Sequence, residues 1–369
     1  MSGEAGDAPG LGPVFDRRAR ERSRWGRRSP GRFDGSVGRD RGGATYAALD
    51  LGTNNCRLLV ARPTDDGFRV VDAFSRIIRL GEGVSASGRL SEAAIGRALA
   101  ALTICRDKMK NKGVTRARLI ATEACRAAAN GDTFRVRVAE TLGLELDVID
   151  RETEATLAAT GCTPLIDPQA AGVVLFDIGG GSSELVRLDR SRHTRRGPPL
   201  PQIRAWISLP HGVVTLAERH GGHNVTRESY EAMVGEVAAL IAPFAQAHGQ
   251  ALRGIDLLGT SGTVTTIAGV HLDLKRYERN RVDGCWMSAQ EIGAVSERLL
   301  AMSYEERVAS PCIGIERADL VLAGCAILEA IRRAFPCPRL RVADRGLREG
   351  MLVQMMREDG VWGAEAALS

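Results

Sequence analysis

Short apolar runs alternate with longer segments of helical periodicity along this chain from residue 44 onward. The runs at 46–49 and 173–176 are followed by turn residues and predict buried strands, whereas 264–270 follows a turn of small residues and predicts a helix. Strands that alternate with helices are typical of α/β proteins, in which helices cover the faces of a sheet. We therefore expect an α/β fold.

One strand–turn signature occurs twice. Four apolar residues are followed by Asp, an aliphatic residue, Gly, small polar residues and a returning strand, first at 46–55 and again at 173–183. The two aspartates, Asp50 and Asp177, are 127 positions apart, which is about the length of one domain. We interpret the repeat as an internal duplication with two related domains, at 44–165 and 166–369, and a cleft between them.

The turns after the predicted strands carry residues whose backbone N–H groups and hydroxyls can cradle phosphate oxygens. A third turn of small residues, at 259–263, precedes the helix at 264–270. Any one of these turns could equally be a tight hairpin or a capped helix, but three in one chain favour a phosphate site. The expected phosphate-binding residues are Gly52, Thr53, Asn54, Asn55, Gly179, Gly180, Gly181, Ser182, Ser183, Gly259, Thr260, Ser261 and Gly262.

An acidic residue ends each of the two duplicated strands. A carboxylate beside phosphate repels it unless the carboxylate holds a cation, so Asp50 and Asp177 imply Mg²⁺. Glu184 follows Asp177 across the turn and could face the same cleft, although a surface position on a strand is the alternative. The chain contains no Gly-Lys dipeptide, which excludes a P-loop, and Glu184 stands where the dinucleotide fingerprint needs Gly.

The charge of the chain lies mainly at its N-terminus. Lys and Arg total 50 and Asp and Glu total 45, a net charge of +5. Residues 1–43 contain ten Arg and six acidic residues, so the remainder of the chain is nearly neutral. This tail is rich in Gly, Arg, Ser and Pro and has no strand or helix period, so we expect it to be disordered. A solvated tail is favoured over an arm that binds nucleic acid.

Membrane and secreted classes are not supported. No apolar run reaches the roughly 18 residues of a membrane span, and the Arg pairs of the tail precede no apolar signal region. The eight Cys form no C-x-x-C pair and the six His have no metal-binding spacing. We expect reduced, mostly buried thiols and a cytoplasmic protein.

These motifs resemble the Ppx/GppA phosphatase family, the exopolyphosphatases and guanosine pentaphosphate phosphohydrolases. The resemblance covers about residues 44–355 and implies two ribonuclease-H-like domains of the actin-like ATPase superfold. It also implies Mg²⁺, with a monovalent cation as a further option, a homodimer, and polyphosphate or guanosine penta- or tetraphosphate as ligand. The matching strings are ALDLGTNN, ATEACRAAAN, ETEA, FDIGGGSSELV, LGTSGT and DRGLREG.

The resemblance also assigns roles to single residues. It identifies Glu154 as the general base within the acidic run at 147–154, whose members would otherwise be read as partners of a helix N-terminus. Arg126 would point at phosphate, where a guanidinium suits oxyanions. Two positions depart from the family pattern: Asp283 stands where His is common, and His211 stands where small residues are usual.

The metal ligands implied by the resemblance are Asp177 and Glu184, with Asp50 as a third. The preferred activity is that of an exopolyphosphatase, which hydrolyses the terminal phosphoanhydride bond of inorganic polyphosphate and releases orthophosphate. The 5′-phosphate of pppGpp is held by the same bond, so a pppGpp 5′-phosphohydrolase is the alternative. The presence of Glu154, Asp177 and Glu184 argues against a non-catalytic sensor of alarmones. The ETEA match argues against a sugar or acetate kinase.

Overall fold

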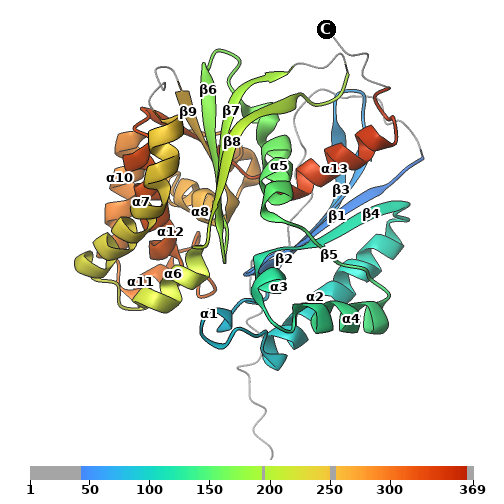
Figure 1. Cartoon of the computed structure of the whole chain (residues 1–369), viewed down its shortest axis with the longest axis horizontal. Helices are drawn as coiled ribbons and strands as arrows, with labels where there is room; N and C mark the ends of the chain where they lie inside the picture. Colours follow the sequence, from blue (N-terminus) through green and yellow to red (C-terminus); the bar gives the residue numbers. More distant parts are fainter. Residues whose placement is uncertain (1–42, 193–195, 250–254, 364–369) are drawn as a thin grey trace, which may run out of the picture.

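The duplication is visible as two sheets that share one strand order (Figure 1). The structure, a computed structural model, describes residues 43–192, 196–249 and 255–363. Residues 1–42, which make up nearly all of the predicted disordered tail, lie outside the described residues.

The first sheet has the order β3-β2-β1-β4-β5. Strands β1, β2 and β3 form an antiparallel meander, and β4 and β5 extend the sheet in parallel beside β1. The apolar run that predicted the first strand is buried at every position from Tyr46 to Leu49. The strands are β1 (Tyr46–Leu51), β2 (Asn55–Pro63), β3 (Phe68–Ile77), β4 (Arg116–Ala121) and β5 (Asp147–Val148).

The second sheet repeats this order and adds one strand. Its order is β10-β11-β9-β6-β7-β8, in which β6, β7 and β8 are the antiparallel meander and β9 and β11 lie parallel beside β6. The prediction of two ribonuclease-H-like α/β domains is confirmed. The strands are β6 (Gly172–Ile178), β7 (Ser183–Arg192), β8 (Leu200–Leu209), β9 (Ile255–Thr260), β10 (Trp286–Ser288) and β11 (Arg339–Ala343).

Helices surround both sheets, and local capping sets several of their starts. The Ser91 hydroxyl accepts a hydrogen bond from the N–H of Ala94 at 3.2 Å and so caps α2. None of the helices in the described segments is long and apolar enough to cross a membrane. The helices are α1 (Val84–Ser87), α2 (Glu92–Asn111), α3 (Glu123–Ala127), α4 (Gly131–Leu142), α5 (Arg151–Cys162), η1 (Thr163–Leu165), α6 (Val213–His220), α7 (Arg227–His248), α8 (Ser261–His271), α9 (Arg279–Val282), α10 (Ala289–Ala301), α11 (Tyr304–Ala309), α12 (Val321–Ala334) and α13 (Leu347–Glu358).

Helices α5 and α13 lie side by side between the two sheets (Figure 1). Although α13 comes from the end of the chain, its Met351, Leu352 and Met356 share a buried core with Tyr46 and Leu59 of the first sheet. The predicted division at residue 165 falls at the end of η1 and stays a prediction. The packing of α13 shows that the C-terminal end of the chain also completes the first core.

All eight cysteines are free thiols, and six of them are buried. The fold agrees with the prediction that most of the thiols are buried, and their reduced state stays a prediction. Their packing in apolar cores explains why the sequence shows no metal-binding or disulfide spacing.

Candidate active site

The two duplicated turns have the same backbone geometry. The N–H of Gly52 donates to the carbonyl oxygen of Asn55 at 2.9 Å, and the N–H of Gly179 donates to that of Ser182 at 3.0 Å. Each turn thus closes a hairpin in the same way at the carboxyl end of its first strand, β1 or β6. The fold confirms the repeated grammar that the sequence predicts.

These turns lie against each other across the molecule. A Cβ added at Gly180 would lie 2.9 Å from the Cβ of Thr53 and 3.2 Å from the backbone nitrogen of Asn54. A Cβ at Gly181 would lie 2.8 Å from the Thr53 hydroxyl oxygen. Real Cβ atoms do not approach this closely, so glycine is required for the two loops to meet. The two donor-rich turns are therefore in direct contact.

The third predicted turn joins β9 to α8 and reaches the same region. Ser261 has a φ of 94°, a conformation that non-glycine residues rarely adopt and that is often found at functional sites. The Ser261 hydroxyl and the side-chain oxygens of Asn54 and Asn55 are buried without a hydrogen-bond partner among the described residues. Buried polar atoms are normally paired, so these three suit a bound ligand. The role of the three turns in binding phosphate stays a prediction.

Asp177 and Glu184 are direct cross-strand neighbours on β6 and β7. Glu184 is only 2% exposed, and its carboxylate accepts hydrogen bonds from the Ser182 hydroxyl at 2.8 Å and the Ser208 hydroxyl at 2.9 Å. Burial raises the pKa of Asp177 to about 6. Burial, with the charge of Asp177 added, raises the pKa of Glu184 to about 7. Burial thus favours the protonated, uncharged form of both carboxylates.

Asp50 and Glu154 add two further carboxylates to this region. Burial raises the pKa of Asp50, and the facing guanidinium of Arg57 opposes that shift. Burial raises the pKa of Glu154 well above its usual range, the nearby charge of Glu184 adds to the effect, and Arg126 opposes it. Each of the four predicted acidic residues therefore interacts electrostatically with at least one other, although they come from four different elements.

The local fold near Glu154 differs from the expected one in its boundaries. The sequence suggests a strand over 144–149 and a helix from about residue 155, but β5 contains only two residues and α5 begins at Arg151. The Asp150 carboxylate accepts from the N–H of Thr153 at 2.7 Å and caps the helix four residues earlier. Glu154 therefore lies in the first turn of α5.

Arg126 is held between two carboxylates. One of its guanidinium nitrogens, Nη2, lies 3.1 Å from Glu154 and 2.7 Å from Glu123, and Arg151 also pairs with Glu123 at 2.9 Å. The resemblance suggested that Arg126 contacts phosphate. The structure shows it contacting Glu154, which it is placed to orient, and its contact with phosphate stays a prediction.

Two arginines near the third turn were not predicted. A Cβ added at Gly262 would lie 3.6 Å from Nη2 of Arg57 and 3.9 Å from the guanidinium carbon of Arg317. Arg317 also donates to the Thr266 hydroxyl at 3.0 Å, and burial lowers its pKa, with the charge of Arg57 adding to the effect. Two guanidinium groups in close proximity favour an anion between them.

A buried ionic cluster braces the start of α13. Arg279 lies 3.1 Å from Glu349 and 3.3 Å from Asp344, and the N–H of Gly346 donates to Glu349 at 2.9 Å. Arg348 lies farther from Glu349, at 4.0 Å. This cluster has a structural role, because it fixes the helix that completes the first core.

The two departures from the family pattern have structural partners. The Asp283 carboxylate forms an ion pair with Arg345 and accepts from the N–H of Asp344 at 3.0 Å. The His211 ring lies 2.5 Å from the carboxylate of Glu236. Asp283 thus holds the loop after β11 in place. His211 holds in place the loop that packs against the second turn.

The predicted Mg²⁺ ligands fit one mode of binding. The described part of the chain contains no group of three or more His, Cys, Asp or Glu side chains that could hold a metal by themselves. Mg²⁺ is commonly bound by one or two carboxylates together with substrate phosphates. Two adjacent carboxylates with raised pKa values, the partly buried Asp177 and the buried Glu184, fit that mode, and Arg57 opposes the shift in the pKa of Asp50.

Comparison with known proteins agrees with this geometry. A model of the Ppx/GppA phosphatase family matches residues 59–359. Exopolyphosphatase 2 of Mycobacterium tuberculosis is 28% identical to this chain over 331 residues, which are 84% of this chain and 98% of that protein. The family match begins within β2 and includes the second and third turns, at 179–183 and 259–263.

Solved structures give the same result. The Ppx/GppA family member of Aquifex aeolicus matches with a TM-score of 0.70 and 28% identity, over 86% of this chain and 98% of that chain. An exopolyphosphatase from Cytophaga hutchinsonii matches with a TM-score of 0.76 and 23% identity, over 87% of this chain and 100% of that chain. At 23% identity, the second match is evidence for the fold alone.

Proposed function

The chain belongs to the Ppx/GppA phosphatase family, and we propose that it is an exopolyphosphatase that releases orthophosphate from the end of inorganic polyphosphate. The observation that carries this proposal is the meeting of the 52–55 and 179–183 turns beside four carboxylates, of which Glu184 is buried and Asp50, Glu154 and Asp177 are partly buried. A site with many backbone donors and clustered acidic groups suits a phosphoanhydride, whose charge must be bound before water can attack.

Each of the site residues has a separate role in the proposed hydrolysis. The backbone N–H groups of the facing turns bind the terminal phosphate, and Arg57 and Arg317 neutralise charge on its far side. Glu154 accepts the proton of the attacking water, and its raised pKa makes the carboxylate a stronger base than a free Glu side chain. Arg126 orients the Glu154 carboxylate through their 3.1 Å contact. Asp177 and Glu184 would hold Mg²⁺, which would neutralise part of the charge of the substrate phosphates.

The alternative activity is hydrolysis of pppGpp to ppGpp. Both substrates end in the same phosphoanhydride, so the residues named above would act on either. A non-catalytic sensor of alarmones would keep the phosphate turns and lack turnover. We include a cytoplasmic location, a homodimer and Mg²⁺ dependence in the proposal.

Phosphate release separates these functions. Wild-type protein and the Glu154→Gln variant would be incubated with Mg²⁺ and either polyphosphates of several lengths or pppGpp. We expect release from polyphosphate and a loss of about 10²–10⁴-fold in kcat in the variant, the contribution typical of a general base. Release from pppGpp alone would support the alternative, and no release from either would support the sensor. Near-equal activity of the variant on both substrates would contradict the role of Glu154.

A further inference from the structure

Helix α6 begins against the second turn, at 179–183, and binds two of its carbonyl groups. The N–H of Val213 donates to the carbonyl oxygen of Gly179 at 3.0 Å, and the N–H of Val214 donates to that of Gly180 at 2.8 Å. A Cβ added at Gly212 would lie 2.3 Å from the carbonyl carbon of Gly180, so glycine is required there. The start of α6 and the turn are therefore in direct contact.

These contacts determine the direction in which the N–H groups of the turn point. The peptide bonds of the turn are trans, so the N–H of each residue points away from the carbonyl group that precedes it. Because α6 binds the carbonyl groups of Gly179 and Gly180, the N–H groups of Gly180 and Gly181 are directed away from α6. Neither of these N–H groups donates to another described residue. They are thus the donors of this turn that a phosphate can use.

A carboxylate of the neighbouring helix α7 contacts both ends of α6. Nε2 of His211, which precedes α6, lies 2.5 Å from the carboxylate of Glu236. Arg219 and His220, in the last turn of α6, lie 2.5 Å and 2.8 Å from the same carboxylate. Burial alone would raise the pKa of Glu236, but His220, His211 and Arg219 together hold it below its usual range. Glu236 therefore acts as an anion that fixes one short helix at its two ends.

His211 is bound on both sides of its ring. Its Nδ1 lies 2.6 Å from the carbonyl oxygen of Pro210, and its Nε2 lies near both Glu236 and Arg219, the latter at 3.2 Å. The protonated ring can donate to Pro210 and Glu236, whereas Nε2 of the neutral ring can accept from Arg219. The ring therefore has a partner in either form. The carbonyl oxygen of His211 also accepts from the Ser183 hydroxyl at 2.8 Å, which links this residue to the turn.

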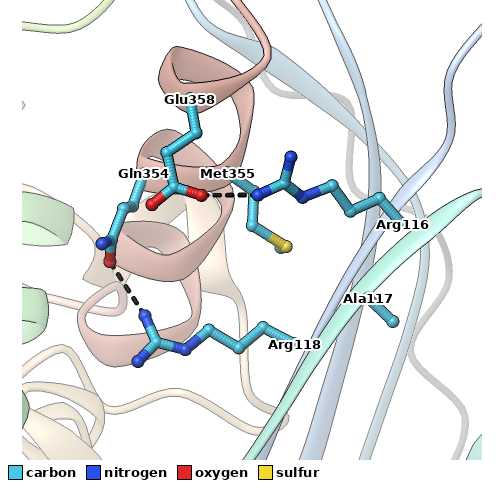
Figure 2. Close-up of a pocket in the computed structure, with 6 residues that line it drawn as sticks. All are labelled: Arg116, Ala117, Arg118, Gln354, Met355 and Glu358. Atoms are coloured by element: carbon cyan, nitrogen blue, oxygen red, sulfur yellow. Dashed lines mark hydrogen bonds and ion pairs between the residues drawn. The ribbon is translucent and has the colours of Figure 1, made fainter.

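Charged side chains also hold α13 against β4, but at a distance in the sequence from every phosphate turn. Arg118 donates to Gln354 at 2.9 Å there, and Arg116 is paired with Glu358 (Figure 2). The cavity of about 310 Å³ that these side chains line includes no residue of the three turns. Glu358 is therefore a matched control for Glu236, because each is an anion that binds basic side chains of a neighbouring element.

We propose that His211 and Glu236 are positioning residues for the turn at 179–183. Glu236 fixes the start of α6 through His211, and α6 fixes the peptide groups whose N–H groups are free to bind substrate. His211 stands where small residues are usual in the family, so this support belongs to this chain rather than to the family pattern. The proposal rests on the proposed function for the claim that the turn binds phosphate.

The position of the turn can be measured without substrate by NMR. In protein labelled with ¹³C and ¹⁵N in glycine only, an experiment that correlates each amide with the preceding carbonyl carbon detects only glycines that follow a glycine. In this sequence these are Gly43, Gly180, Gly181 and Gly222. The signals of Gly180 and Gly181 include the carbonyl carbons of Gly179 and Gly180, which are the two groups that α6 binds.

These two signals should report the loss of either positioning residue. We expect them to move in His211→Ala and in Glu236→Ala, and to stay in place in the control Glu358→Ala. His211→Gln, which keeps a side-chain N–H donor toward Glu236, should return them most of the way to their wild-type positions. Unchanged signals in His211→Ala would overturn the proposal, whatever the activity of the protein proves to be.

Kinetics test whether this position of the turn affects the reaction. In His211→Ala, KM for tripolyphosphate should rise about tenfold, the effect of weakening one hydrogen bond to a charged group. The value of kcat should change less, because Glu154 lies on α5 and is not held by α6. We expect His211→Gln to restore most of the affinity, and Glu358→Ala to leave KM and kcat unchanged.

The outcomes separate this proposal from the proposed function. A fall in kcat with an unchanged KM in His211→Ala would contradict the positioning role, since the turn is inferred to bind the substrate. Absence of phosphate release by the wild-type protein would count against the proposed function, and the NMR signals alone would then decide whether His211 and Glu236 position the turn.

Discussion

Substituting Gly161 by alanine should separate the two central helices. Gly161 of α5 lies against the carbonyl oxygen of Gly346, and a Cβ built on it would lie only 1.9 Å from that oxygen. The reciprocal contact, from Gly350 of α13 to the carbonyl oxygen of Leu157, would measure 2.0 Å. The oxygens belong to the backbone, so no side-chain rotation can relieve either clash.

The size of the effect follows from these distances. A carbon and a carbonyl oxygen in contact need about 3.3 Å, so α5 and α13 must move apart by roughly 1.4 Å. Overpacking of this kind costs about 1–3 kcal/mol, and the rigid obstacle places it at the upper end. Alanine gains at most about 1 kcal/mol over glycine in helix propensity. The cost of the clash therefore exceeds the gain in helix propensity, and Gly161→Ala should lower the free energy of unfolding by about 2 kcal/mol.

The movement of α5 should also displace the predicted catalytic base on that helix. Glu154 lies seven residues before Gly161, about 10 Å along the same helix. A displacement of about 1 Å in a catalytic group can cost 10²-fold in rate. We expect kcat for polyphosphate to fall by about that factor.

Urea denaturation and phosphate release would measure the two effects. Gly96→Ala is the control: Gly96 lies within α2, and a Cβ there would meet no atom within 4 Å. The free energy of unfolding of that variant should rise by up to about 1 kcal/mol, and its activity should be unchanged. If Gly161→Ala were as stable as Gly96→Ala, the inferred close contact between α5 and α13 would be wrong.

Two further predictions concern buried charges. Burial alone would raise the pKa of Glu349, but Arg348 and Arg279 hold it below its usual range; Glu349→Gln should therefore cost about 3–5 kcal/mol in urea denaturation at neutral pH. That difference should shrink as pH falls toward the lowered pKa, and a cost below about 1 kcal/mol would contradict the cluster. Because the pKa of Glu184 is raised to about 7, the folded protein is destabilised by this carboxylate above that pH and not below the unfolded value of 4.5. Without Mg²⁺, Glu184→Gln should thus be more stable than wild type by on the order of 2 kcal/mol at about pH 8, with little difference near pH 4.5; equal melting temperatures at both pH values would refute the assigned pKa shift.

The parts of the site that the sequence predicts are those encoded by local signals. A run of apolar residues, an aspartate and a glycine turn specify both a strand and what lies at its end, so Asp50, Asp177 and their turns could be located in advance. Glu184 was predictable because strands pair across a two- to four-residue turn with fixed register. These residues need no knowledge of the rest of the chain.

The remaining parts depend on long-range packing. Arg317 lies between α11 and α12 in a stretch with no distinctive pattern, and only the fold brings it to Arg57. The start of α5 was missed because a cap at Asp150 outweighs the weak strand pattern before it. The position of α13 against the first sheet could not be read from its own sequence, since an apolar helix face does not specify its partner.

The repeat explains why one wall of the cleft differs from the other. Asp50 faces Arg57 across β1 and β2, and Asp177 faces Glu184 across β6 and β7. The offset of 127 residues that relates the two aspartates also relates Arg57 to Glu184. The same structural position thus carries opposite charges in the two copies. The first copy forms a pair of opposite charges, whose arginine can contact an anion, and the second forms an acidic pair whose pKa values are raised mainly by burial. In the proposed mechanism, this change of sign would make one wall suited to phosphate and the other to Mg²⁺, and directed attack on a terminal phosphorus requires such an asymmetry.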